Sequence, residues 1–128
     1  MYKKLIYWMI LLLSLSSVAF AEAEFDFEEL MEAVEDNTYE LQATIVAEDI
    51  DASLALAQKL DSDFKKVQGY FADWGDAQDA VLDAQRYQQA LTEIVALLQQ
   101  RDFKTATTKA VEFADRCDQA CHDTYKPL

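Results

Sequence analysis

Glycine and proline are almost absent from this chain, and this scarcity constrains the fold more than any other feature of the sequence. The 128 residues include two glycines and one proline. Hairpins, tight turns and phosphate-binding loops need these residues at defined positions. Alanine, leucine, glutamate, glutamine and lysine, which are common here, favour helices. The composition therefore predicts an all-α protein.

The first 21 residues have the pattern of a secretory signal peptide. Two lysines precede an unbroken apolar run, and Ala19-Phe20-Ala21 matches an A-x-A cleavage site. Serines interrupt the run before it reaches the ~20 apolar residues that span a bilayer, so we expect cleavage rather than anchoring. The sequence predicts a signal peptide at 1–21, a single mature domain at 22–128, a periplasmic location and no stable membrane insertion of the mature chain.

The mature chain is strongly acidic, which limits the classes of partner and activity. Removing residues 1–21 takes away two of the eleven basic residues and none of the 24 acidic ones, so the net charge changes from -13 to -15. Such a surface repels nucleic acid and suits a partner with a basic docking surface. One histidine cannot supply a di-iron or histidine-rich zinc site, and the two mature serines fit no hydrolytic triad, so we expect no enzyme.

Four stretches carry apolar residues at alternating spacings of four and three, as in helices that pack one face against neighbours. Breaks are expected near 47–50, between Gly69 and Gly75, and around Arg101-Asp102. Short connections favour antiparallel neighbours, which predicts an up-down-up-down antiparallel four-helix bundle. The stripes are Phe27, Met31, Val34, Thr38, Leu41 and Ile45; Leu56, Leu60, Phe64, Val67 and Phe71; Ala77, Val81, Ala84, Gln88, Leu91, Val95 and Leu98, with Tyr87 and Ile94 beside them; and Phe103, Ala106, Ala110, Phe113, Cys117 and Cys121.

Both cysteines and the only histidine lie together in the segment Cys117-Asp118-Gln119-Ala120-Cys121-His122. A histidine directly after the second of two spaced cysteines is typical of c-type haem attachment, in which two thioethers hold the porphyrin and the imidazole ligates the iron. This motif predicts covalent haem c bound by Cys117, Cys121 and His122. Three residues separate the cysteines instead of the usual two, so non-covalent haem b and a local disulfide remain open alternatives.

The extra residue changes the geometry of the motif. His122 is five positions after Cys117, about 140° round a regular helix, and a wider turn such as a π-bulge would be needed to aim all three side chains at one porphyrin. A disulfide between Cys117 and Cys121 is sterically conceivable, because residues one turn apart lie about 6 Å apart at Cα. Its loop is so small that it would restrain the unfolded chain little.

Both ends of the mature chain resemble known haem bundles. The run Cys121-His122-Asp123-Thr124-Tyr125-Lys126, after a first cysteine, resembles the carboxy-terminal C-x-x-C-H-x-x-Y-R/K site of the cytochrome c-prime family. The segment from Phe27 to Asn37 is similar to the first helix of the related soluble b-type cytochrome bundle, in which a methionine at the place of Met31 is the second axial ligand. The resemblance implies that His122 is the proximal ligand of the iron and Met31 the sixth ligand.

The predicted topology supports this ligand pair. Met31 lies about five residues into its helix and His122 about one turn from the end of its own, so both lie at similar depth at one end of the bundle. A His/Met-ligated iron would be six-coordinate, low-spin and suited to electron transfer, whereas an open distal side would bind a small gas such as nitric oxide.

The sequence therefore predicts a periplasmic c-type cytochrome that carries one electron between redox partner proteins. The alternatives are a five-coordinate gas-binding protein of the cytochrome c-prime type and a haem-free exported helical bundle with a local disulfide. Phe27, Phe113 and Tyr125 are candidates for the haem walls, and Arg116 for a propionate contact. Stripes of this width also support a homodimer.

Overall fold

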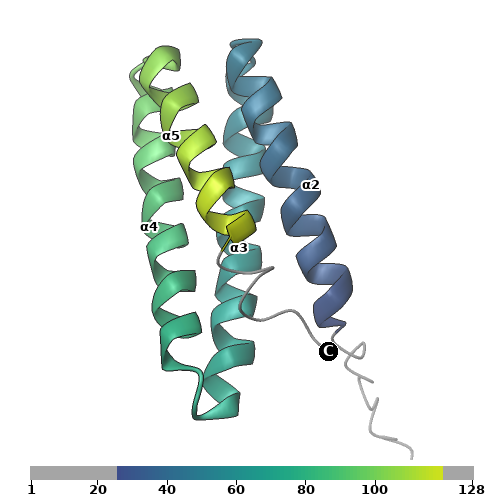
Figure 1. The fold of residues 1–128 in the computed structure, drawn as a ribbon. Coiled ribbons are helices and arrows are strands. Elements are labelled where there is room, and N and C mark those ends of the chain that lie inside the picture. Colours follow the sequence, from purple (N-terminus) through teal and green to yellow (C-terminus); the bar gives the residue numbers. More distant parts are fainter. Residues whose placement is uncertain (1–25, 120–128) are drawn as a thin grey trace, which may run out of the picture.

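The computed structural model describes residues 26–119, which form four α-helices (Figure 1). Helix α2 spans Phe27–Val46, α3 spans Ile50–Trp74, α4 spans Gln78–Gln99 and α5 spans Phe103–Cys117. There is no strand within these residues. The predicted all-α bundle is confirmed at this level.

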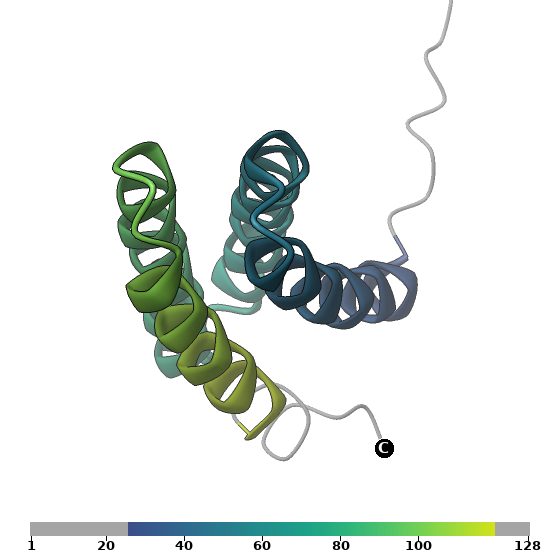
Figure 2. The ribbon, with the colours of Figure 1, turned by 90° about the horizontal axis from the view of Figure 1, so that it is seen from above.

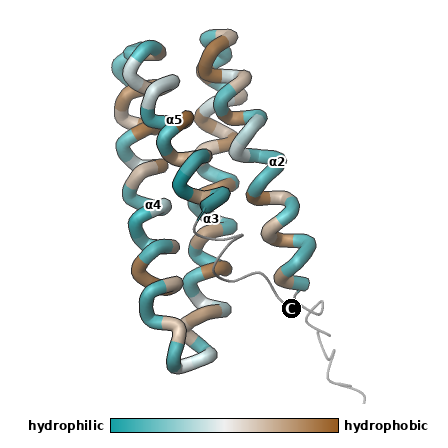
Figure 3. Tube along the Cα trace, in the orientation of Figure 1, coloured by the Kyte–Doolittle hydropathy of each residue, from teal (hydrophilic) through white to brown (hydrophobic). Residues whose placement is uncertain are grey.

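Each helix packs against the next one in the chain, and α2 also packs against α5. The most extensive contact is between α3 and α4. Figure 2 shows these two helices nearly end-on, whereas α2 and α5 run obliquely across them. Figure 3 shows polar and apolar residues alternating along every helix, as expected when each helix turns one face inward.

The core consists mainly of the predicted stripes, with local shifts on α3 and α4. All of the inward residues expected within α5 after its first turn are buried, and so are Val34, Leu41 and Ile45 of α2. On α3 and α4 the buried side chains include Ala57, Tyr87 and Ile94, whereas Leu56, Gln88 and Val95, which the stripes had placed inward, are only partly buried. An α-helix has 3.6 residues per turn, whereas spacings that alternate between three and four average 3.5. The buried face therefore moves gradually away from a stripe drawn with these spacings.

The α2–α3 connection ends the first helix with a left-handed residue that is not glycine. Glu48 has φ 56°, its N–H donates to the carbonyl of Ile45, and the N–H of Asp49 donates to the carbonyl of Thr44, both at 3.0 Å. These two bonds form a Schellman motif, which satisfies carbonyls at the helix end. Asp49 then caps α3, since its carboxylate accepts a hydrogen bond from the N–H of Ala52 at 3.1 Å.

The α4–α5 connection repeats this design. Arg101 has φ 57°, and the bonds from Arg101 and Asp102 to the carbonyls of Leu98 and Leu97 are again 3.0 Å long. Asp102 caps α5 through the N–H of Thr105 at 3.1 Å. Both breaks lie where the sequence predicts them.

The break predicted between Gly69 and Gly75 lies at the far end of that interval. Helix α3 continues through Gly69 and ends at Gly75, which adopts the left-handed conformation with φ 77°. Glycine inside a helix costs about 1 kcal/mol relative to alanine. Here Val67 and Phe71, on either side of Gly69, are buried in the core, and burial of two such side chains contributes more than that cost.

Candidate functional site

A small hollow between α2 and α5 brings together two residues that the sequence analysis selected. Met31 of α2 and Cys117, the last residue of α5, both line it. Met31 is partly buried and Cys117 is buried, with 6% of its surface exposed. Cys121 and His122, the other predicted ligands, lie outside the described residues.

The wall of the hollow beside Met31 is apolar because of the spacing along α2. Val34 and Thr38 follow Met31 on the same face of the helix, and both are buried. The hydroxyl of Thr38 donates to the carbonyl of Val34 at 2.7 Å, so its polar atom is satisfied within the helix. The inner part of this wall therefore presents methyl groups and the Met31 thioether, whereas Glu35, Tyr39 and Asp118 contribute polar groups to the lining.

The residues of this hollow suit a haem in their chemistry, and its size limits where such a group would lie. The Met31 thioether is a group that can ligate haem iron, and the Cys117 thiol is the group from which a covalent thioether to a porphyrin is formed. The volume of the hollow is about 20 Å³, enough for one water molecule. The hollow is therefore too small to enclose a porphyrin, and Met31 and Cys117 are the described residues that could contact one at its edge.

The backbone widens directly after Cys117. Asp118 and Gln119 form a π-type turn, and the N–H of Asp118 donates to the carbonyls of Ala114 and Asp115. The extra spacer residue predicts a wider turn at this point, and the structure has one at the first two spacer positions. Such turns are common at functional sites because they rotate the following side chains relative to a regular helix.

A buried tyrosine ties the end of α5 to α4. The hydroxyl of Tyr87 donates to the carbonyl of Arg116 at 2.9 Å. Its ring lies 5.1 Å from that of Phe64 and 5.7 Å from that of Phe113, centroid to centroid. Phe113, a candidate haem wall, thus belongs to an aromatic core cluster. Sequence reasoning placed Tyr87 beside the stripe and missed this anchoring role, although a tyrosine among apolar residues often has a hydrogen-bond partner for its hydroxyl.

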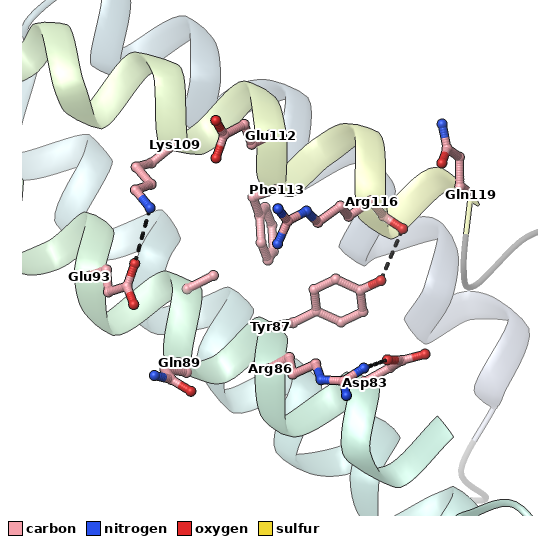
Figure 4. A pocket seen from close by; sticks show the side chains of 11 residues that line it. Asp83, Arg86, Tyr87, Gln89, Glu93, Lys109, Glu112, Phe113, Arg116 and Gln119 are labelled. Carbon is pink, nitrogen blue, oxygen red and sulfur yellow. Dashed lines mark hydrogen bonds and ion pairs between the residues drawn. The ribbon is translucent and has the colours of Figure 1, made fainter. Parts of the chain in front are cut away.

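A larger groove of about 610 Å³ lies between α4 and α5 (Figure 4). Its walls carry three basic and three acidic side chains, of which Lys109 and Glu93 form an ion pair at 3.4 Å. The side chain of Arg116 extends along this groove beside Phe113. Arg116, the candidate for a propionate contact, therefore lines this groove and not the hollow that contains Met31.

Phe27, another candidate haem wall, belongs to an aromatic cluster that joins the beginning of α2 to the end of α3. Its ring stacks on Tyr70, with centroids 4.0 Å apart and planes at 12°, and meets Phe71 edge-on at 5.4 Å. Tyr70 and Phe71 contact Trp74 at 5.3 and 5.2 Å. Because Phe27 is one helical turn before Met31, the cluster adjoins the hollow. The apolar periodicity did not reveal this cluster.

Within residues 26–119, no helix has the length and continuous apolar composition that a membrane span needs. No three histidine, cysteine, aspartate or glutamate side chains among residues 26–119 converge as metal ligands. Comparison of the chain with protein-family models, with curated proteins and with solved structures finds no match.

Proposed function

We propose that this chain is an exported c-type cytochrome with a four-helix-bundle fold, which carries one electron on a haem ligated by His122 and Met31. The observation that carries the proposal is that Met31 and Cys117 line the same hollow. Met31 lies near the start of the mature sequence and Cys117 begins the CxxxCH motif near its end. Their meeting between α2 and α5 supports the proposal because it brings the proposed axial ligand Met31 beside the first cysteine of the attachment motif.

The composition leaves one His/Met pair per copy of the mature chain. His122 is the only histidine, and Met31 is the only methionine outside residues 1–21. His122 is five positions after Cys117, a separation of at most about 18 Å along the chain. This short separation supports a shared iron for His122 and Met31.

When bound, the haem supplies one-electron chemistry at its iron. Cys117 and Cys121 would hold the porphyrin through thioethers, and His122 and Met31 would ligate the iron. Val34 and Thr38, both buried, shield one side of Met31 from water. Low solvent access around an axial ligand is one of the means by which a protein sets a redox potential.

The antiparallel up-down-up-down order and export belong to the same proposal. Connections of three residues, at 47–49, 75–77 and 100–102, join helices that pack against each other, which supports an antiparallel order. The positively charged start, the apolar run and the A-x-A site support a cleaved signal at 1–21 and a periplasmic location.

The test is to express the full chain in a bacterial host that attaches haem c, and to purify the mature protein. We expect a red protein whose mass includes one haem and whose colour stays with the polypeptide after acid-acetone extraction. Cys117→Ser and Cys121→Ser should each remove one thioether. Extractable colour would replace haem c by non-covalent haem b. A colourless protein with the mass of the polypeptide alone would overturn the proposal and favour the haem-free bundle.

A further inference from the structure

Trp74 lies exposed where α3 ends, beside the aromatic cluster that contains Phe27. Its exposed fraction is 53%, and its ring contacts the partly buried Tyr70. A large aromatic side chain at the surface is the kind of residue that most often anchors a protein interface. We call Trp74, the exposed part of Tyr70, and the carboxylates around them the Trp74 patch; these carboxylates are Asp26, Asp73, Asp76 and Asp79, all exposed.

The Trp74 patch is uniformly negative. Segments 26–35 and 67–85 meet at this end of the bundle through the stack of Phe27 on Tyr70. Together they contain nine aspartates and glutamates and no lysine or arginine. The groove between α4 and α5 differs, since three cations balance three carboxylates there. The Trp74 patch therefore combines exposed aromatic surface with negative charge, whereas the similarly acidic α2–α3 connection has no exposed aromatic side chain.

We propose that the Trp74 patch docks a redox protein with a lysine-rich surface. Trp74 and Tyr70 offer ring faces to lysine or arginine side chains, and the surrounding carboxylates steer a basic protein toward them. A second copy of this chain, with the same excess of carboxylates, is repelled at this surface, as are anionic lipids. Phe27 lies between the patch and Met31, one helical turn before it, so a docked protein would lie close to the proposed axial ligand. The redox role of this docking rests on the proposed function.

The test is a titration of the full mature protein, labelled with ¹⁵N, with unlabelled basic cytochrome c of the mitochondrial type at low salt. Trp74 is the only tryptophan outside residues 1–21, so its indole N–H gives a single assigned signal. We expect the largest shift changes at this signal and at residues 70–79. The chemical shift of the Trp74 indole does not depend on the colour of the protein, so the titration can be read with haem-bound and with haem-free protein.

Matched variants separate local docking from general attraction. Asp73→Asn with Asp76→Asn should weaken binding about fivefold, as expected when two rim charges of ~0.5 kcal/mol each are lost. Glu48→Gln with Asp51→Asn removes the same charge at the α2–α3 connection and should change the affinity less than twofold. Trp74→Ala should weaken binding at least tenfold, and Val46→Ala, which trims another exposed apolar side chain, should leave it unchanged.

Three results would overturn the docking proposal. The first is a set of chemical-shift changes centred on the α4–α5 groove. The second is an equal loss of affinity in the two double variants that remove charge. The third is a Trp74 signal that moves when the protein alone is diluted, because this would mean that a second copy covers the patch. A red protein without shifts at Trp74 would refute the docking and leave the haem proposal standing. A colourless protein with shifts at Trp74 would support the docking and refute the haem proposal.

Discussion

The hydroxyl of Tyr87 on α4 donates to the backbone carbonyl of Arg116 on α5 at 2.9 Å, one residue before Cys117. Carbonyls in the last turn of a helix have no partner within the helix. Tyr87 supplies one from the neighbouring helix and fixes the position from which the CxxxCH segment begins. The bond therefore couples core packing to the start of the proposed haem site.

We predict that Tyr87→Phe lowers the free energy of unfolding by about 1 kcal/mol, the usual net contribution of one such hydrogen bond. The ring and its contacts with Phe64 and Phe113 remain, so the effect reports on the hydroxyl. Amide hydrogen exchange at Cys117 and Asp118 should become faster. Tyr39→Phe, which removes a hydroxyl from a tyrosine that is 55% exposed, is the control and should change the stability by less than 0.5 kcal/mol. Equal effects of the two variants would refute the anchoring role.

Met31→Ala tests the axial ligand. If the thioether binds the iron, the oxidised protein loses its methionine-to-iron charge-transfer band and becomes high-spin, while the thioethers keep the haem attached. Leu30→Ala truncates a neighbouring side chain on α2 that does not line the hollow and should leave the spectrum unchanged. An identical spectrum in wild type and Met31→Ala would remove Met31 from the iron and favour the five-coordinate, gas-binding alternative.

Asp102 should make the stability of α5 dependent on pH in the acid range. The hydrogen bonds from the side chain and backbone of Thr105 hold the pKa of Asp102 below its usual value of 3.8, and Lys104 adds to the effect. Because the folded state favours the charged form, this stabilisation is complete above the unfolded pKa and is lost as the pH falls through the lower, folded pKa. The difference in unfolding free energy between wild type and Asp102→Asn should therefore be constant near neutral pH and shrink below pH 3.8. Asp115→Asn on the same helix controls for the change in net charge.

Asp63 is buried on α3 and depends on two lysines. Its carboxylate lies 3.1 Å from the ammonium of Lys59 and 3.3 Å from that of Lys66, and its side chain is 7% exposed. We predict that Lys59→Met with Lys66→Met costs about 1–3 kcal/mol, because a buried carboxylate then has no cation beside it. Asp63→Asn should cost less, since both lysines are half exposed and water can solvate them. Urea denaturation of the wild type, the double lysine variant and Asp63→Asn gives their free energies of unfolding. A larger loss of stability in Asp63→Asn than in the double lysine variant would contradict this account.

The sequence predicted most of the fold because most of it follows from local rules. The stripes gave the core positions of α2 and α5, and Asp49 and Asp102 lie at cap positions where their short carboxylates can reach the backbone. Gly69 did not end α3, because core burial on either side outweighs its low helix propensity, and the break lies at Gly75 instead. Tyr87 replaced Gln88 in the core because the helix phase could be fixed only to within one residue.

The candidate site was predicted less completely than the fold. The motif identified Cys117, and the resemblance of the first helix identified Met31, which the structure places on the same hollow. The Trp74 patch could not be predicted, since it depends on which residues of α3 the start of α2 meets. Phe27 and Tyr70 are far apart in sequence, and only the packing of α2 on α3 stacks them.

The two left-handed residues that end α2 and α4 provide the last prediction. A residue other than glycine costs about 1–2 kcal/mol in this conformation, and glycine costs about 0.5–1 kcal/mol of extra chain entropy on folding. Arg101→Gly should therefore raise the free energy of unfolding by about 0.5–1 kcal/mol, with Glu48→Gly similar. Gln100→Gly, one residue earlier at φ -82°, relieves no strain and should lower the stability. Thermal and urea unfolding of the matched pair at positions 100 and 101 decides the matter: a loss of stability in Arg101→Gly would mean that the arginine side chain stabilises the end of α4 by more than its backbone conformation costs.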